Sequence, residues 1–331
     1  MSLISHPVPP LYRQRTFSEK LGDTTDFVSS NWRVMLRYLA VFLLPLCLVQ
    51  ALNINQFLSV VMADATGGLT DSDYVGFALN YFSLIVFGMI GSVVLCCVVY
   101  ALMRIYHGMS PVEGLSADGG SQQSLGSLTW QQLRPVFKSM LRPAFKSLGA
   151  LIVTGIVAVV VLVLGIVVGS VMLRPLGDLG GVLFLVFFLA AVLFALAVYS
   201  AIALILPVYS FERIGFWAGM AKAARYGFKT LGGCMALLFV VSLLTSVVTG
   251  VIGMPFMILT VLKALFIEDN ASFDFAGTPW FAFLQYLVTI IYIFVSYISY
   301  SLLFVAIAYQ YGHASEKLDG VGVEEFENAS L

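Results

Sequence analysis

Two stretches of the sequence carry basic residues at helical spacing, and positively charged side chains bind anionic groups. In residues 129–147 (TWQQLRPVFKSMLRPAFKS) a basic residue recurs every four positions, and in residues 215–230 (GFWAGMAKAARYGFKT) three basic residues fall within a narrow arc of a helical wheel. Apolar side chains take the opposite side of each helix, which is typical of helices that lie at a membrane surface. The candidate contacts with lipid headgroups or a protein partner are Lys222, Arg225, Lys229, Arg134, Lys138 and Arg142.

A stripe of polar side chains follows one face of the apolar segment at residues 283–304. Its members recur at i, i+4, i+7 and i+11, which places them on one side of a helix. One interpretation is a path for a solute, and the other is helix packing, because hydroxyl groups form hydrogen bonds between membrane helices. The residues of the candidate solute path are Gln285, Thr289, Tyr292 and Ser296.

The sequence lacks the common signatures of an enzyme site. It has no Gly-x-Ser-x-Gly, no His-Glu-x-x-His and no Gly-x-x-x-x-Gly-Lys motif. His107 and His313 each lie just beyond a predicted membrane span, and we interpret them as ordinary interfacial side chains. We therefore predict a non-catalytic protein that needs no cofactor or metal, and we expect no nucleic-acid partner.

Four cysteines lie within apolar runs, and two of them are adjacent in the sequence. This spacing fits neither a zinc site nor a redox motif. We predict that they are small, buried apolar side chains. They are Cys47, Cys96, Cys97 and Cys234.

The composition excludes a water-soluble globule. Of the 331 residues, 60% are hydrophobic and 11% are charged, whereas soluble domains carry about 25% charged residues. A membrane-spanning helix needs about 20 apolar residues. Six segments meet this requirement: 34–62, 74–105, 147–173, 181–211, 232–266 and 280–311. The middle of each segment lacks ionisable residues, which argues against a carrier that couples transport to a buried carboxylate.

The distribution of lysine and arginine predicts the orientation of these spans. Fifteen of the seventeen basic residues lie on the flanks of one side, and the opposite loops hold Arg174 and Lys263. Because basic residues accumulate on the cytosolic side, both termini are expected there. The first apolar run begins near Val34, after a polar segment, so no cleavable signal peptide is predicted.

The expected fold is all-α: a polytopic membrane protein with six transmembrane helices in three hairpins. A cytosolic amphipathic in-plane helix precedes each hairpin, the first of them at residues 16–32. Pro143 is expected to end the second in-plane helix, because proline lacks a backbone donor. The predicted order is an N-terminal segment (1–33), hairpin 1 (34–105), a linker and helix (106–146), hairpin 2 (147–211), an interfacial helix (212–231), hairpin 3 (232–311) and an acidic cytosolic tail (312–331). The tail is either a disordered end or a peptide that pairs with the basic helices.

The junction at residues 205–233 (ILPVYSFERIGFWAGMAKAARYGFKTLGG) resembles a known family. It is similar to the membrane domain first named for its fusion to glycerophosphoryl diester phosphodiesterases, and to related bacterial six-span inner-membrane proteins. The residues that carry the resemblance are Pro207, Glu212, Gly215, Phe216, Ala223 and Phe228. Residues 17–39 look like the opening of such proteins. The resemblance implies a multi-pass protein of the bacterial inner membrane without the phosphodiesterase activity, which belongs to a separate soluble domain.

Two functions remain in view. The first is a non-catalytic membrane protein that organises anionic lipid, or a complex with a cytosolic or membrane protein partner, through its basic helices. The second is a permease or exporter of a small or amphipathic solute that uses the polar faces of the fifth and sixth spans. The sequence does not determine the oligomeric state.

Overall fold

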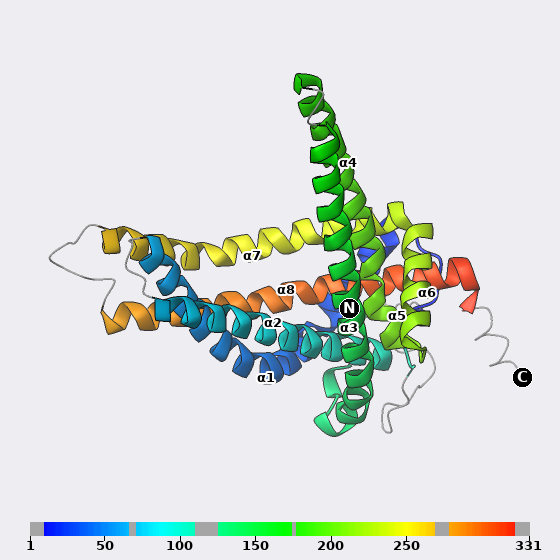
Figure 1. Ribbon diagram of the computed structural model, residues 1–331. Helices are drawn as coiled ribbons and strands as arrows, with labels where there is room; N and C mark the ends of the chain where they lie inside the picture. The colour runs from blue at the N-terminus through cyan, green and yellow to red at the C-terminus, as the bar shows by residue number, and fades with distance from the viewer. Residues whose placement is uncertain (1–9, 66–70, 110–124, 174–176, 269–277, 322–331) are drawn as a thin grey trace, which may run out of the picture. The chain divides into compact units, whose positions relative to one another are not determined.

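The computed structural model describes residues 10–65, 71–109, 125–173, 177–268 and 278–321, and the elements in these ranges are helices (Figure 1). A short 3₁₀ turn (Leu125–Ser127) precedes α3. The α-helices are α1 (Phe17–Ala65), α2 (Asp71–Tyr106), α3 (Trp130–Leu173), α4 (Gly177–Ala203), α5 (Ile205–Phe211), α6 (Phe216–Lys229), α7 (Leu231–Glu268) and α8 (Pro279–Asp319). The prediction of an all-helical chain is therefore confirmed for the described residues.

Five of the described helices contain a segment long and apolar enough to cross a membrane. They are α1, α2, α3, α7 and α8. In α4, the apolar stretch Leu179–Ala195 is shorter than the others. The structure thus supports a membrane protein with several spans, while a sixth span and the pairing into three hairpins remain predictions.

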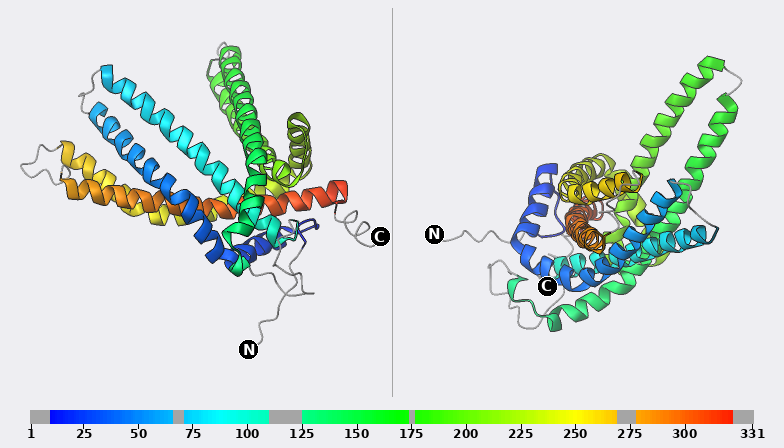
Figure 2. Two further views of the ribbon diagram at one scale, coloured as in Figure 1. Left: turned by 90° about the horizontal axis from the view of Figure 1, so that it is seen from below. Right: turned by 90° about the vertical axis from the view of Figure 1, so that its left-hand side faces the viewer.

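The chain divides into two compact units, which are described separately. The first unit comprises residues 1–30, 100–240 and 304–331, and the second comprises residues 31–99 and 241–303. In the first unit, α3 and α4 lie side by side (Figure 2). In the second unit, Phe57 of α1 stacks on Phe77 of α2, and Phe256 of α7 stacks on Tyr292 of α8, with ring centroids 5.1 and 5.2 Å apart.

Two of the long helices begin at capping boxes, in which a threonine and the residue three positions later satisfy the free donors of the first turn. At α1, the Thr16 backbone N–H donates to Glu19 Oε2 over 2.7 Å. At α3, the Thr129 backbone N–H donates to Gln132 Oε1 over 3.0 Å. These caps fix where the helices begin, at residues 17 and 130.

Pro143 lies inside a continuous helix, whereas Pro207 follows a helix break. The prediction that Pro143 ends a helix was therefore wrong. α3 continues through Pro143 without a break, so the amphipathic segment and the apolar segment form one helix. A proline removes one hydrogen bond, and the buried side chains of Met140 and Ala144 on either side hold the helix together. Pro207, by contrast, lies within α5 just after the break between α4 and α5 at Leu204, so the predicted span 181–211 is divided into two helices.

A helix break between a predicted in-plane helix and the apolar helix that follows it is found at one of the three expected places. Thr230 lies between α6 and α7. α1 runs unbroken from the amphipathic N-terminal segment through Pro45 into the apolar segment. Along α1 and α3 the sequence changes from an amphipathic pattern to an apolar one. This change does not require the helix to end, because the backbone hydrogen bonds can continue through it.

Candidate functional site

The basic helix α6 has three kinds of surface rather than two. Its buried side contains Gly219, Ala223 and Tyr226. Its apolar side remains exposed, with Trp217 72% and Phe228 52% accessible. The basic residues lie between these surfaces, so α6 packs on its own chain along one side and leaves aromatic side chains exposed along another.

Close packing of α6 depends on the missing side chain of Gly219. A Cβ atom at this position would lie 2.6 Å from the ring of Tyr209, on α5. The Tyr209 hydroxyl donates to the carbonyl of Phe216, in the first turn of α6. The glycine and the hydroxyl together fix α6 against α5.

Lys222 joins α6 to the segment that precedes it. Its Nζ lies 2.7 Å from Glu212 Oε2, and the side chains of these two residues are 26% and 17% accessible. The other carboxylate oxygen of Glu212 accepts a hydrogen bond of 2.6 Å from the hydroxyl of Tyr311, on α8. The carboxylate of Glu212 therefore has a partner at both oxygens and links α6 to α8.

Asp319, at the end of α8, makes a second connection with α6. Its carboxylate pairs with Arg225 and accepts a hydrogen bond from the hydroxyl of Tyr226. Lys222 Nζ lies 3.4 Å from the same carboxylate. The beginning of the acidic tail is thus helical and pairs with a basic helix, while residues 322–331 lie outside the described part.

The environment of Lys222 favours its charged form. Burial alone would lower the pKa of this side chain, but the hydrogen bond and the negative charge of Glu212 raise it above its ordinary value of 10.5. Lys222 therefore stays charged at every physiological pH.

The N-terminal segment is fastened to the same end of α8. Arg15 is 3% accessible; its guanidinium pairs with Asp23 at 2.6 Å, and its backbone N–H donates to His313 Nδ1 over 3.0 Å. At Gly312 a Cβ atom would lie 2.2 Å from the carbonyl oxygen of Leu11. Only glycine leaves room for the segment to cross α8 here.

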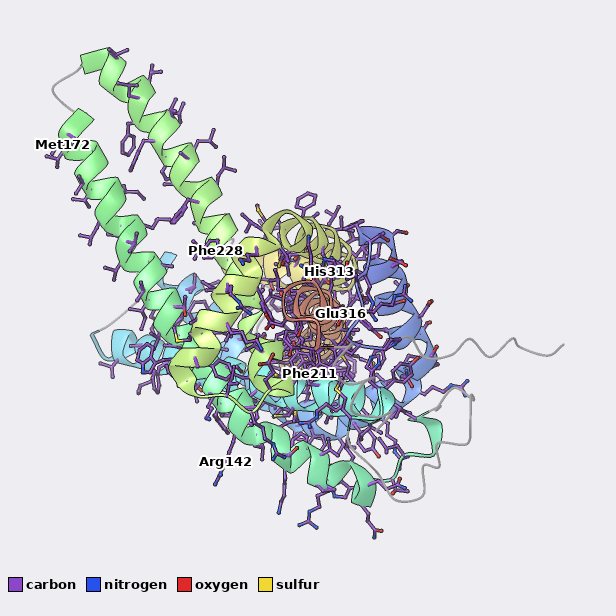
Figure 3. The ribbon with its side chains drawn as sticks, turned by 90° about the vertical axis from the view of Figure 1, so that its right-hand side faces the viewer. Arg142, Met172, Phe211, Phe228, His313 and Glu316 are labelled. Atoms are coloured by element: carbon purple, nitrogen blue, oxygen red, sulfur yellow. The ribbon has the colours of Figure 1, made fainter. Side chains whose placement is uncertain are left out.

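A buried row of polar groups links α1, α8 and the start of α7. Lys20 Nζ donates to Gln310 Oε1 over 2.8 Å, and Gln310 Nε2 donates to Thr230 Oγ1 over 3.0 Å. Figure 3 views α8 from this end, where His313 and Glu316 are labelled. Sequence reasoning missed this network because its members lie far apart in the chain.

The other predicted contact residues have a different environment. The side chains in question are exposed, and they form no ion pair with a carboxylate that the structure describes. They are Arg134, Lys138 and Arg142 on α3, and Lys229 on α6. Of the six predicted contacts, Lys222 and Arg225 are thus held by carboxylates of the chain itself, and these four remain available to anions.

Arg142 lines a basic cavity of about 480 Å³ in the first unit. Four basic side chains from three segments surround it: Arg104 at the end of α2, Arg142 and Lys146 on α3, and Arg213 after α5. Within the described residues, none of the four forms an ion pair. Arg104 Nε is buried and has no hydrogen-bond partner there.

Sequence reasoning did not assign Arg104 or Arg213 to a site. Each lies at the end of an apolar segment, where a basic residue is normally interpreted as a sign of the orientation of the membrane span. The sequence did show that Arg104 lies at the end of one predicted span and Arg213 just after another, on the side predicted to carry the basic residues 129–147.

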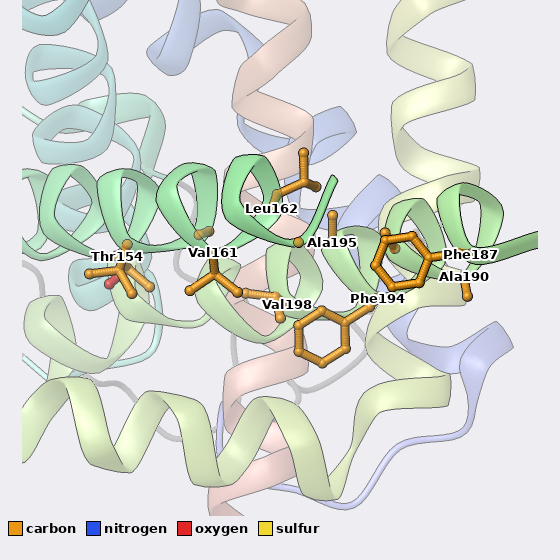
Figure 4. Close-up of a pocket in the computed structure, with 12 residues that line it drawn as sticks. Thr154, Val161, Leu162, Phe187, Ala190, Phe194, Ala195 and Val198 are labelled. Carbon is orange, nitrogen blue, oxygen red and sulfur yellow. The ribbon is translucent and has the colours of Figure 1, made fainter. Parts of the chain in front are cut away.

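An apolar groove of about 530 Å³ lies farther along α3, between α3 and α4 (Figure 4). Thr154, Val161 and Leu162 line it from α3, and Phe187 and Phe194 line it from α4. The 18-residue apolar window of α3 has no buried residues. This pair of helices therefore presents apolar side chains outward along its length.

The predicted polar stripe of α8 lies in the second unit and turns largely inward. Thr289 and Gln285 are buried, and the Thr289 hydroxyl donates to the Gln285 carbonyl over 2.7 Å. The Ser296 hydroxyl donates to the Tyr292 carbonyl, also over 2.7 Å. Asn55 Oδ1 of α1 lies 3.5 Å from the Thr289 hydroxyl. The residues of this stripe line neither the basic cavity nor the apolar groove.

The remaining candidate groups are structural. The four cysteines are buried and free, as predicted. The ring of His107 packs edge-on against Tyr309, with centroids 5.8 Å apart. Among the described residues, no group of three or more His, Cys, Asp and Glu side chains is placed to hold a metal ion.

No protein-family model, curated protein or solved structure matches this chain. The class of protein therefore rests on the chain itself. Five helices long and apolar enough to cross a membrane define a multi-pass membrane protein.

Proposed function

We propose that this chain is a non-catalytic protein of the bacterial inner membrane with six spans in three hairpins. It gathers anionic lipid, and through it a membrane-associated complex, at its cytosolic face. Both termini lie on that face. The resemblance of residues 205–233 to bacterial inner-membrane proteins agrees with this assignment.

The observation that carries the proposal is the exposed basic and aromatic surface of α3 and α6. Arg134 and Lys138 on α3 and Lys229 on α6 are exposed, and so is a tryptophan of each helix: Trp130 is 41% and Trp217 72% accessible. Tryptophan prefers the headgroup level of a bilayer, and each basic side chain near an anionic surface contributes about 1 kcal/mol of attraction. This combination attracts negatively charged headgroups from the surrounding bilayer.

Fluorescence of Trp217 tests the proposal directly. The full chain, with its other three tryptophans changed to phenylalanine, is reconstituted in bilayers that contain brominated phosphatidylglycerol or brominated phosphatidylcholine. We expect stronger quenching by the anionic lipid at low salt, and a smaller difference at high salt because salt screens exposed charges.

A matched pair of variants locates the effect on α6. Lys229→Gln should reduce the preference for the anionic lipid, and Lys263→Gln, near the end of α7, should preserve it. Equal quenching by the two lipids at low salt would contradict the proposal.

A solute pathway is the second candidate, and one observation favours it. Asn55 Nδ2 and Gln285 Nε2 are buried without hydrogen-bond partners in the described structure, and buried donors are normally paired. A solute with acceptor groups would satisfy them. Thr289→Cys tests this candidate, because the four native cysteines are buried. Modification of the new cysteine by a water-soluble thiol reagent would support a pathway, and complete protection would rule it out.

A further inference from the structure

The basic cavity concentrates positive charge without a matching negative group. Its described lining contains four basic residues and a single carboxylate, that of Glu212. Lys222 and Tyr311 already occupy the two oxygens of that carboxylate. The charges of Arg104, Arg142, Lys146 and Arg213 are therefore uncompensated within the described chain.

Such a cavity has the chemistry of a phosphate site. Arginine presents several donors in a plane that matches phosphate oxygens, and lysine adds a point charge. A buried guanidinium nitrogen without a partner, such as Arg104 Nε, is costly unless an acceptor joins it. The volume of about 480 Å³ lies within the range of small-ligand sites. A phosphate monoester carries up to two negative charges. It therefore neutralises more of the positive charge of the cavity than a phosphate diester does.

The apolar groove lies farther along the helix that lines the cavity. The cavity is lined by α3 residues at positions 139, 142, 143 and 146, and the groove by those at positions 154, 157, 158, 161, 162 and 165. Members of each set recur at intervals of three and four, so each set lies on one side of α3. From Lys146 to Thr154 the helix rises about 12 Å.

The length of the groove along α3 is about the thickness of one lipid leaflet. From Thr154 to Gly165 α3 rises about 16 Å, and half of a hydrocarbon core is about 15 Å thick. The walls of the groove are apolar side chains, among them Val161, Phe187 and Phe194 (Figure 4). A hydrocarbon chain fits this surface, and a water-soluble phosphate compound would leave it unused.

We propose that the first unit binds one lipid with a phosphate monoester headgroup: the phosphate lies in the basic cavity, and an acyl chain lies in the groove between α3 and α4. The proposal rests on the proposed attraction of anionic lipid and adds a discrete site to it. The phosphate is held by Arg104, Arg142, Lys146 and Arg213, while Lys222 keeps Glu212 neutralised.

Native mass spectrometry of the full chain in detergent provides the test. The protein is titrated separately with phosphatidic acid, phosphatidylglycerol, phosphatidylcholine and inorganic phosphate. We expect one tightly bound phosphatidic acid per chain. Lys146→Gln together with Arg213→Gln, both at exposed positions, should weaken it about 25-fold, or about fivefold per cation.

Matched controls separate the site from general surface charge. Arg33→Gln with Arg37→Gln removes two exposed cations of α1 that belong neither to the cavity lining nor to the proposed lipid-attracting surface of α3 and α6, and should leave phosphatidic acid binding unchanged. Ala191→Phe, which fills the groove, should weaken phosphatidic acid but not inorganic phosphate, whereas Val160→Phe outside the groove lining should alter neither.

Three results would overturn the site. Equal losses in the two double variants would mean a diffuse surface effect. Inorganic phosphate that binds as tightly as phosphatidic acid would mean a site for a soluble anion. Phosphatidylcholine that binds as tightly as phosphatidic acid would mean that the groove alone retains lipid. Each result leaves the Trp217 quenching experiment intact, so the failure of the site and the failure of the proposed function can be told apart.

Discussion

α6 and α3 carry similar patterns of basic and apolar residues, yet their basic side chains have different surroundings. On α6, Lys222 and Arg225 pair with Glu212 and Asp319. On α3, Arg142 and Lys146 line a cavity with two further arginines and pair with no described carboxylate. We infer that the first set fastens the fold and the second set is available for a ligand.

This difference shows that a helical wheel alone does not predict which cations are available to a ligand. The wheel gives the face on which a cation lies, but it does not give the acids that the rest of the chain brings to that face. Glu212 lies ten residues before Lys222, and Asp319 lies 94 residues after Arg225. Nothing in the pattern of residues 215–230 distinguishes these paired cations from the exposed Lys229.

The largest expected effect comes from the packing that holds α6. Gly219→Ala should destabilise the protein by about 1–3 kcal/mol, because its Cβ would lie 2.6 Å from the Tyr209 ring. Gly232→Ala, where a Cβ would meet nothing within 4 Å, is the control and should be neutral or stabilising. Thermal unfolding in detergent measures both. Equal stability of the two variants would show that α6 is not closely packed on α5.

A second, smaller effect distinguishes the two sets of cations. Glu212→Gln removes the ion pair with Lys222 and should cost about 2 kcal/mol, as expected for a part-buried hydrogen bond to a charged group. Arg213→Gln in the cavity should change stability by less than about 0.5 kcal/mol, and any change should be favourable because it relieves repulsion. If both variants lost the same stability, the proposed division between fastening and binding cations would be wrong.

Asp319→Asn should cost less, about 1 kcal/mol, because this ion pair is more accessible than that of Glu212. The side chains of Arg225 and Asp319 are 48% and 24% accessible. The loss should shrink in the background of Arg225→Gln, since the partner is already absent. A loss of the same size in both backgrounds would show that Arg225 does not contribute to the connection with α8.

The smallest expected effect is that of pH. The pKa of Lys222 is raised in the folded state above its ordinary value of 10.5, so the stability that it contributes is fully present below that value and is lost only as the pH rises beyond it. The stability difference between the native chain and Lys222→Gln should therefore be constant from pH 6 to pH 9. A difference that falls within this range would contradict the ion pair.

Much of the fold follows from the sequence, because long apolar runs must form helices in a membrane. The all-helical architecture, the spans of α1, α2, α3, α7 and α8, and the buried cysteines were predicted on this basis. The continuity of α3 through Pro143 was not, since it depends on packing around the proline rather than on the residue alone. The break at Leu204 was missed although Pro207 was visible in the sequence.

The candidate site was less predictable than the fold. Arg142 was identified from its helical spacing, but Arg104 and Arg213 belong to different segments that only the fold brings to one cavity. The Thr16–Glu19 and Thr129–Gln132 caps match the capping-box pattern, but we did not predict them from the sequence. The role of Gly312, by contrast, depends on the crossing of Leu11 over α8 and has no local signal.

One measurement tests the central distinction most directly: the amount of phosphatidic acid retained by two double variants of the full chain, compared by native mass spectrometry. We predict that Arg142→Gln with Lys146→Gln loses the bound lipid, and that Arg225→Gln with Asp319→Asn, which removes an ion pair outside the cavity, retains it with a lower unfolding temperature. Retention by the first variant and loss by the second would contradict the account.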